Sequence, residues 1–250
     1  MNFKPGQCFR RLWRPGIDGL MSVQSNLVPS EAALNQSSVA LSLLVQKFEI
    51  LARFIELDGR NLDAFSHMTR EFLILSCTEV ETSLRSVLIA SDPAKADQRL
   101  TTNDYVRLCD PLFLREYETT LRHYQSIPKF RPFLNWDTAK PTASLPWYDA
   151  YNAVKHDRES QLHRATFKCC IEALAAAAVL CCAQFSIPVD ADWAHEPSYS
   201  INQWFRIELA NPDLKTFYIP NVEIPVGRGA ELWLFDGRNS VVWQPEPFVI

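Results

Sequence analysis

Glycine is scarce in this chain of 250 residues, and none occurs between Gly59 and Gly227. A Walker loop or a dinucleotide-binding fingerprint needs glycines where the backbone wraps around a phosphate group. The few glycines outside this stretch match neither spacing. The sequence therefore excludes nucleotide chemistry that is built on glycine-rich loops.

The chain also lacks an excess of positive charge and a long apolar run. Its formal net charge is −4, whereas a general nucleic-acid or anionic-membrane binder usually carries a broad basic surface. The longest apolar run, Ala173 to Ala183, is far shorter than the roughly 20 residues that a membrane span needs. The arginines near the N-terminus precede no apolar run, so we expect no secretory signal. These absences predict a soluble cytoplasmic protein without a membrane partner.

Seven cysteines are present, but none of them forms a Cys-x-x-Cys motif, so a zinc site made of thiolates has no support. Two adjacent pairs, Cys169–Cys170 and Cys181–Cys182, lie within an alanine-rich helical pattern. Neighbouring residues on a helix point about 100° apart, so we expect small core residues here and no disulfides. This number of free thiols indicates a reducing compartment. No metal and no cofactor is expected.

Apolar residues recur at helical spacing through most of the chain, which predicts a mainly α fold, an antiparallel helical bundle. Pro111 is expected to kink the third helix or to start a new one, and several prolines indicate an ordered loop before the fourth helix. The predicted helices span residues 38–57, 61–90, 102–124 and 146–185, and the loop spans residues 126–146.

The composition changes after Pro188, where short aromatic and β-branched segments favour strands. Residues 236–239 are typical of a hairpin turn. The predicted strands are 204–209, 216–219, 231–235 and 240–243. We therefore expect an extended N-terminal arm (1–35), a helical bundle (36–187) and a small antiparallel, β-rich C-terminal appendage (188–250).

The start of the fourth predicted helix holds the most informative residues. On a continuous helix Asn152 lies within about 40° of His156, and His163 within about 20° of it, so the three residues share one side. Histidine is the side chain best suited to move protons near neutral pH. Four basic residues surround this side: Lys155, Arg158, Arg164 and Lys168. The opposite side is expected to face the core with Trp147, Tyr151, Val154 and Ala165.

Other interpretations of these residues remain open. The stripe could be an ordinary solvated helix face on which the histidines occur by chance. A metal site is disfavoured, because the two histidines would lie two turns, about 10 Å, apart along the axis. Arg158 points close to the apolar side of the helix, so we expect an ion pair with Glu79 or Glu81 to brace the core.

Two segments resemble the HEPN superfamily of helical-bundle proteins: residues 70–85 and the sequence from Asn152 to His156. Active members of that family share an arginine, then a polar residue that is often asparagine, and a histidine five positions after the arginine. Here Tyr151 stands where the arginine is expected. A literal match, Arg158 to His163, follows further along, with Glu159 after the arginine.

The resemblance implies a metal-independent reaction on RNA. The motif arginine would hold the scissile phosphate, and the histidine would move a proton at the 2′-hydroxyl group. It also implies a homodimer in which the two motif helices face each other. A tyrosine can donate a hydrogen bond but supplies no positive charge, so Tyr151 would weaken stabilisation of the transition state.

Two hypotheses of different classes follow. In the first, the protein is a non-catalytic or weakly active dimeric module that binds RNA, a nucleotide or a protein partner. It would bind through the face of Asn152, His156 and His163, with Tyr151, Lys155 and Arg158 contacting the ligand. In the second, it is a metal-independent endoribonuclease of the toxin or phage-defence type, with Asn152, His156 and His163 as its catalytic residues.

Overall fold

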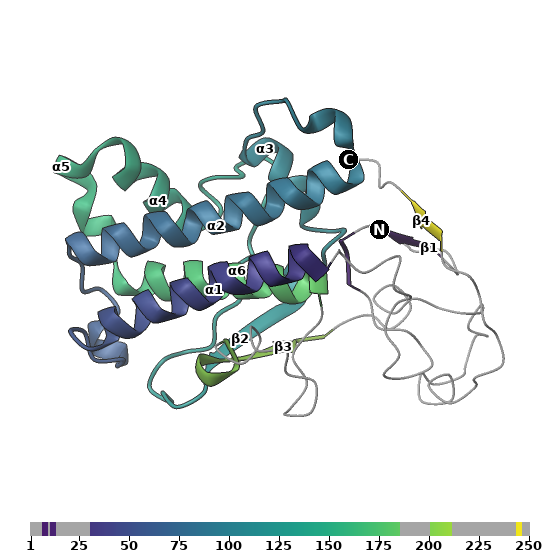
Figure 1. Ribbon diagram of the computed structural model, residues 1–250. Coiled ribbons are helices and arrows are strands. Elements are labelled where there is room, and N and C mark those ends of the chain that lie inside the picture. The colour runs from purple at the N-terminus through teal and green to yellow at the C-terminus, as the bar shows by residue number, and fades with distance from the viewer. Residues whose placement is uncertain (1–6, 10, 14–30, 186–200, 212–243, 247–250) are drawn as a thin grey trace.

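Four long helices form the body of the molecule, as the ribbon of the computed structural model shows (Figure 1). The structure describes residues 7–9, 11–13, 31–185, 201–211 and 244–246. The fold is mainly helical with a small antiparallel sheet, as the sequence predicted. The long helices are α1 (Glu31–Ala52), α2 (His67–Ser91), α4 (Pro146–His156) and α6 (Phe167–Phe185). The short ones are α3 (Thr102–Tyr105), α5 (Arg158–Gln161) and the 3-10 turns η1 (Gly59–Asn61), η2 (Pro93–Lys95), η3 (Val106–Leu108), η4 (Leu114–Glu116) and η5 (Leu162–Arg164).

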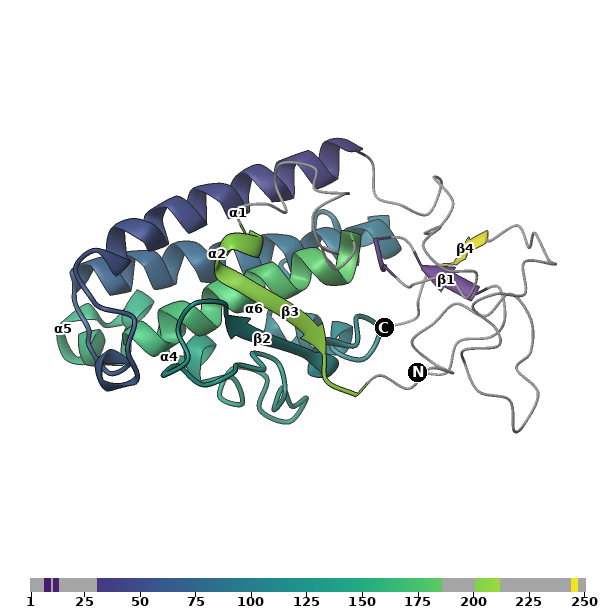
Figure 2. The ribbon, with the colours of Figure 1, turned by 90° about the horizontal axis from the view of Figure 1, so that it is seen from below.

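Helix α6 is the centre of the bundle and contacts α1, α2 and α4 (Figures 1 and 2). Its alanines and cysteines have small side chains, so three neighbouring helices can approach it closely. Cys169, Cys170 and Cys182 are buried and Cys181 is half-buried, which confirms the prediction of small core residues. By length and composition α6 could also cross a membrane, but 83% of its apolar window is buried inside the bundle. A helix that is apolar all round and buried in this way is typical of a protein core.

Local sequence signals set the ends of α2. At its N-terminus Ser66 and Thr69 form a capping box, in which each side chain accepts a hydrogen bond from the other's backbone N–H. At its C-terminus Asp92 is followed by Pro93, which cannot continue the helical hydrogen bonds. Helix α1 already includes residues 31–35, which were expected to belong to the extended arm.

The prediction of a helix over 102–124 is wrong for most of that range. Helix α3 and η3 end at Leu108, and residues Tyr117–Leu121 form strand β2. Two adjacent threonines occupy β2, and its residues alternate between buried and half-buried, which is the period of a strand. Strand β2 pairs in antiparallel register with β3 (Phe205–Leu209), from Tyr117 opposite Leu209 to Leu121 opposite Phe205.

The predicted strand at 204–209 is therefore confirmed, but its partner comes from the middle of the chain. A second, parallel pair joins β1 (Gln7–Phe9) to β4 (Gln244–Glu246), so one strand lies within the range expected to form the extended arm. The other predicted strands, 216–219, 231–235 and 240–243, and the turn at 236–239 lie outside the described residues.

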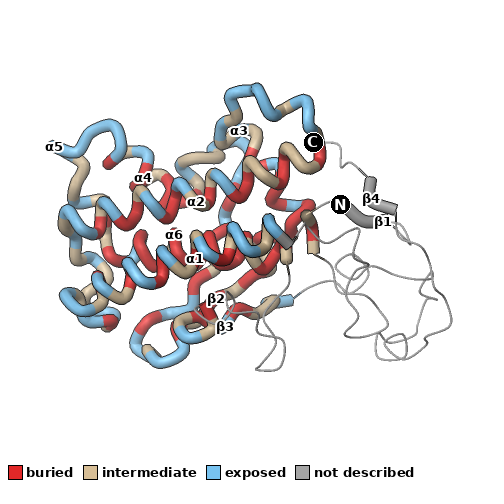
Figure 3. The backbone as a smooth tube through the Cα atoms, in the orientation of Figure 1, coloured by how far each residue is buried: buried red, intermediate tan, exposed pale blue. Residues whose placement is uncertain are grey.

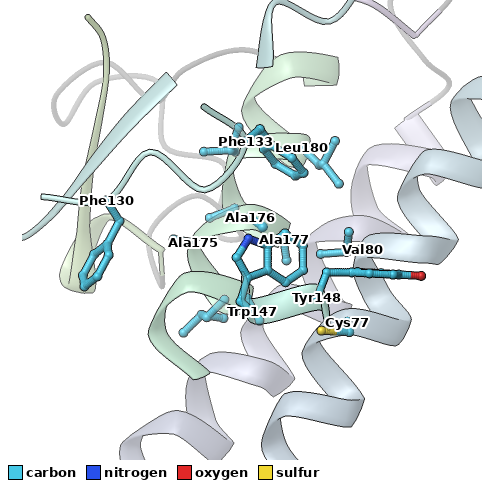
Figure 4. Close-up of a cluster of buried hydrophobic side chains, with 14 of the residues drawn as sticks. Cys77, Val80, Phe130, Phe133, Trp147, Tyr148, Ala175, Ala176, Ala177 and Leu180 are labelled. Atoms are coloured by element: carbon cyan, nitrogen blue, oxygen red, sulfur yellow. The ribbon is translucent and has the colours of Figure 1, made fainter. Parts of the chain in front are cut away.

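The proline-rich loop at 126–146 packs on the helices, as predicted. Phe133 and Trp136 are buried, and the Phe133 ring meets the Trp147 ring edge-on with their centroids 5.9 Å apart (Figure 4). The indole N–H of Trp147 donates to the carbonyl of Pro132 at 2.9 Å. These contacts anchor the first turn of α4, the helix that carries the candidate site.

Candidate functional site

The predicted fourth helix is not continuous, which corrects the sequence analysis. Helix α4 ends at His156, and α6 begins only at Phe167. Between them, residues 157–166 form what we call the α4–α6 connection, with the single turns α5 and η5. Residues 157–160 and His163 are exposed, and the segment projects from one end of the bundle (Figures 1 and 3).

Two capping residues explain the interruption. Asp157 leaves helical geometry at φ −137°, and its carboxylate accepts the backbone N–H of Ser160 at 3.1 Å. Thr166 accepts the backbone N–H of Cys169 at 3.3 Å, which starts α6. Short polar side chains of this kind favour helix N-termini because they replace missing backbone partners. Asp157 and Thr166 were therefore the sequence signal for the break.

Backbone pairing with a preceding loop fixes the start of α6. The N–H of Phe167 donates to the carbonyl of Ala64, and the N–H of Lys168 to that of Leu62, both at 2.8 Å. A loop that is distant in the sequence thus supplies partners for N–H groups that a helix N-terminus leaves free. The sequence around residue 167 therefore gives no sign of these hydrogen bonds, because their acceptors lie about 100 residues earlier in the chain.

Asn152 and His156 lie one turn apart on α4, and both are exposed. His163 is exposed as well, but it belongs to η5. The three side chains therefore do not form one helical stripe. Among the described residues, none of the three has a side-chain hydrogen bond. The structure brings Asn152 and His156 together on one face and places His163 on a separate turn.

Arg158 is exposed and does not point into the core, so the expected ion pair with Glu79 or Glu81 is wrong. Its predicted direction assumed that α4 continues beyond His156. Glu81 instead accepts a hydrogen bond from the hydroxyl of Tyr148, and Glu79 bonds to Ser83 within its own helix. The predicted core side of the site is otherwise confirmed: Trp147, Tyr151, Val154 and Ala165 are all buried.

A polar cluster that the sequence did not reveal joins α2 to α4. It consists of Glu81, Tyr148, Tyr151 and Lys155. The Lys155 ammonium group donates to the Tyr151 hydroxyl at 2.8 Å and lies 5.0 Å from the centre of the same ring. The two tyrosine rings meet edge-on at 5.3 Å. Tyr151 is only 2% exposed, so it would act on a bound ligand through Lys155.

The protonation states in this cluster follow from burial and hydrogen bonding. Burial, with Glu81 nearby, raises the pKa of Tyr148, and burial raises the pKa of Tyr151. The hydrogen bond to Tyr151 raises the pKa of Lys155. At neutral pH both hydroxyl groups are therefore neutral, and Lys155 carries its charge at the surface.

Two further contacts hold α4 and the connection in place. The guanidinium group of Arg70 donates to the carbonyl of Val154 at 3.0 Å, which satisfies a carbonyl in the last turn of α4. Arg164 forms a salt bridge with Asp149, so η5 is tied to the first half of α4. Arg164 is consequently paired with a carboxylate, whereas Lys155, Arg158 and Lys168 form no salt bridge with another described residue.

What remains exposed is a group of side chains that we call the basic surface: Lys155, His156, Arg158, His163 and Lys168. None of them has a salt bridge to another described residue. Hydrogen bonds from Ser160 lower the pKa of Asp157, so this carboxylate is ionised, and Glu159 is exposed beside it. No cluster of metal-ligating side chains occurs in the part of the chain that the structure describes. The cationic side chains of this surface can bind an anion, and its two imidazoles can exchange protons with a ligand.

Comparison of the chain with protein-family models, with curated proteins and with solved structures finds no match. The likeness to the HEPN superfamily therefore depends on the two sequence segments alone and stays a prediction.

Proposed function

We propose that the protein binds single-stranded RNA through the basic surface and does not cleave it. The observation that carries this proposal is a set of exposed cationic and imidazole side chains that form no salt bridge with another described residue, on a protein whose net charge is −4. Lysine and arginine bind phosphate groups, and imidazole rings can stack on unpaired bases. The amide of Asn152, exposed on the same helix, adds hydrogen-bonding capacity.

Three features favour binding over catalysis. Tyr151 stands where the motif arginine is expected. It is buried, and its hydroxyl oxygen accepts a hydrogen bond from Lys155. The two histidines lie on different elements, α4 and η5. Neither imidazole is oriented by a hydrogen bond to a described residue, whereas a general base works from a held position. The resemblance to a family that acts on RNA supports RNA as the polynucleotide.

Fluorescence anisotropy with a labelled single-stranded RNA tests the proposal. We expect the triple variant Lys155→Ala, Arg158→Ala, Lys168→Ala to bind at least tenfold more weakly than the unchanged protein, because each lost charge removes a phosphate contact. Lys140→Ala is the matched control, since Lys140 is an exposed lysine of the loop at 126–146 and does not belong to the basic surface. Equal affinity of the triple variant and the unchanged protein would contradict the proposal.

The exposure of His156 and His163 favours one alternative, a metal-independent endoribonuclease. The same RNA, incubated with protein and EDTA and then analysed on a denaturing gel, separates the two functions. We expect the RNA to stay intact. Cleavage that is lost in both His156→Ala and His163→Ala would establish the alternative, because general acid–base groups typically contribute about 10²–10⁴-fold to the rate.

A further inference from the structure

The outward side of α1 carries a row of exposed apolar residues. Val39, Leu43 and Ile50 are 60%, 55% and 47% exposed, and they lie within about 40° of one another around the helix. Phe54, two residues past the end of the helix, is 73% exposed. Single exposed apolar side chains are ordinary, but several on one side of a helix can mark an interaction surface. Here the exposed polar residues Gln46 and Lys47 lie at the middle of the row.

Helix α2 widens this row. It runs antiparallel to α1 at its side (Figure 1), and the two helices are linked by the ion pair of Lys47 with Glu71 at 3.4 Å. Four residues before Lys47 is Leu43, and four residues after Glu71 is Leu75, so these two leucines lie at one level. Ile50 is three residues after Lys47 and Met68 is three residues before Glu71, so these two residues also lie at one level. Met68 and Leu75 are 42% and 37% exposed. We call the six residues the apolar face: Val39, Leu43, Ile50, Phe54, Met68 and Leu75.

The apolar face is symmetric about its own middle. On α1 the midpoint of Val39 and Phe54 is also the midpoint of Leu43 and Ile50, between Gln46 and Lys47. On α2 the midpoint of Met68 and Leu75 lies beside Glu71. Both midpoints fall at the level of the central ion pair. A twofold axis at this level would place Val39 opposite Phe54, Leu43 opposite Ile50 and Leu75 opposite Met68 of a second copy.

We propose that the apolar face binds a second copy of this chain, with the two α1 helices antiparallel. An isologous contact requires a surface that is complementary to itself after a twofold rotation, and the spacing of these six residues meets that requirement. The arrangement differs from the one that the HEPN resemblance implies, in which the motif helices face each other.

The charges are compatible with this pairing. Each copy contributes one Lys47 and one Glu71 to the centre of the contact, so the net charge there is zero. Lys47 of one copy could also pair with Glu71 of the other. From Ala32 to Gln46 helix α1 contains no charged residue. In the antiparallel pair, Arg53 of one copy would therefore lie opposite the uncharged residues 32–46 of the other copy. No pair of like charges is forced together without a counterion.

The size of the apolar face predicts a reversible dimer. A stable interface of standard size involves roughly 20–30 residues from each partner, and six apolar side chains with their neighbours make a smaller contact. We therefore expect a dissociation constant on the order of 1 μM to 100 μM, where monomer and dimer coexist.

Sedimentation equilibrium of the full chain, over a range from below to above that constant, measures the association. We expect the mass to rise from 28.6 kDa towards twice that value. The double variant Leu43→Lys, Ile50→Lys should weaken association at least 100-fold, because both lysines would face an apolar partner. Leu134→Lys, a substitution of an exposed leucine outside the apolar face, is the matched control and should associate like the unchanged chain.

A cysteine pair tests the register. Gln46→Cys lies at the proposed axis and should form a disulfide between copies under mild oxidation, whereas Val39→Cys alone should not. Mixing Val39→Cys with Phe54→Cys should restore the crosslink. A chain that stays monomeric at the highest concentration, or a dimer that the double lysine variant leaves unchanged, would overturn the proposal. The apolar face and the basic surface share no residue, so failure of one proposal is distinguishable from failure of the other.

Discussion

At the scale of single residues, the polar groups of α4 fall into two sets, one that contacts other helices and one that faces solvent. Tyr148 and Glu81 link α4 to α2, and Lys155 extends this cluster from the buried Tyr151 to the surface. Asn152 and His156 lie on the same helix without such contacts to described residues. The first set positions α4, and the second set is available to a ligand.

The hydrogen bond between Tyr148 and Glu81 gives a stability prediction. Tyr148→Phe removes the bond but keeps the ring, and it should lower the free energy of unfolding by about 1 kcal/mol. Urea denaturation measures the change. Tyr124→Phe is the control, because the ring of Tyr124 stacks on Trp204 and its hydroxyl group has no hydrogen bond to a described residue. An unchanged or higher stability of Tyr148→Phe would show that the bond does not hold the helices together.

Glu172 gives a prediction on pH. Burial in α6 raises the pKa of its carboxyl group above the ordinary value. The folded state therefore binds this proton more tightly than the unfolded state does. The resulting contribution to stability is complete below the unfolded pKa and is lost as pH rises through the folded pKa.

Glu172→Gln should remove this loss, so the variant should gain stability over the unchanged protein as pH rises from about 4 to about 8. Thermal unfolding at a series of pH values measures the difference. Parallel curves for the two proteins across the whole range would contradict this role of burial.

At the scale of elements, the sequence was informative where a helix forms by itself and misleading where distant contacts decide. The spacing of apolar residues predicted α1, α2 and the apolar α6, because each buries one side or all sides against the bundle. The same spacing failed over 102–124. There β2 exists because β3, more than 80 residues later, supplies its hydrogen bonds.

The break after His156 has one cause that the local sequence shows and one that it does not. Asp157 was a visible capping signal, whereas the pairing of Phe167 and Lys168 with the loop near Ala64 was not. The candidate residues could therefore be chosen from the sequence, but their mutual placement could not. Whether His163 shares a face with His156 depends on where α4 ends.

Asp157 gives a prediction at this scale. Asp157→Ala should lower the free energy of unfolding by about 1 kcal/mol, because it removes the side chain that caps α5. Asp157→Asn keeps an oxygen that can accept the backbone N–H of Ser160, and it should retain most of the stability. Urea denaturation of both variants checks the comparison. A loss in Asp157→Asn as large as that in Asp157→Ala would contradict the role of the cap.

At the scale of the whole molecule, two surfaces remain after the bundle has buried its core. The residues of the basic surface belong to α4, the α4–α6 connection and the first turn of α6, and Figure 3 shows α5 of this connection at one end of the bundle. The apolar face lies along α1 and α2, and Figure 2 shows α1 at one edge of the bundle with α4 towards the other. A dimer formed through the apolar face would leave both basic surfaces open, so two copies could bind one RNA strand.

The central claim is that the basic surface binds RNA through its phosphates, and the salt dependence of binding tests it most directly. For single strands the logarithm of the affinity falls with the logarithm of the salt concentration, with a slope of about −0.7 for each phosphate contacted. Anisotropy titrations at several salt concentrations give this slope. We expect it to become shallower by about 2 when Lys155, Arg158 and Lys168 are replaced together by alanine, and to stay unchanged in Lys140→Ala. An unchanged slope in the triple variant, or an affinity for RNA that does not depend on salt, would contradict the account.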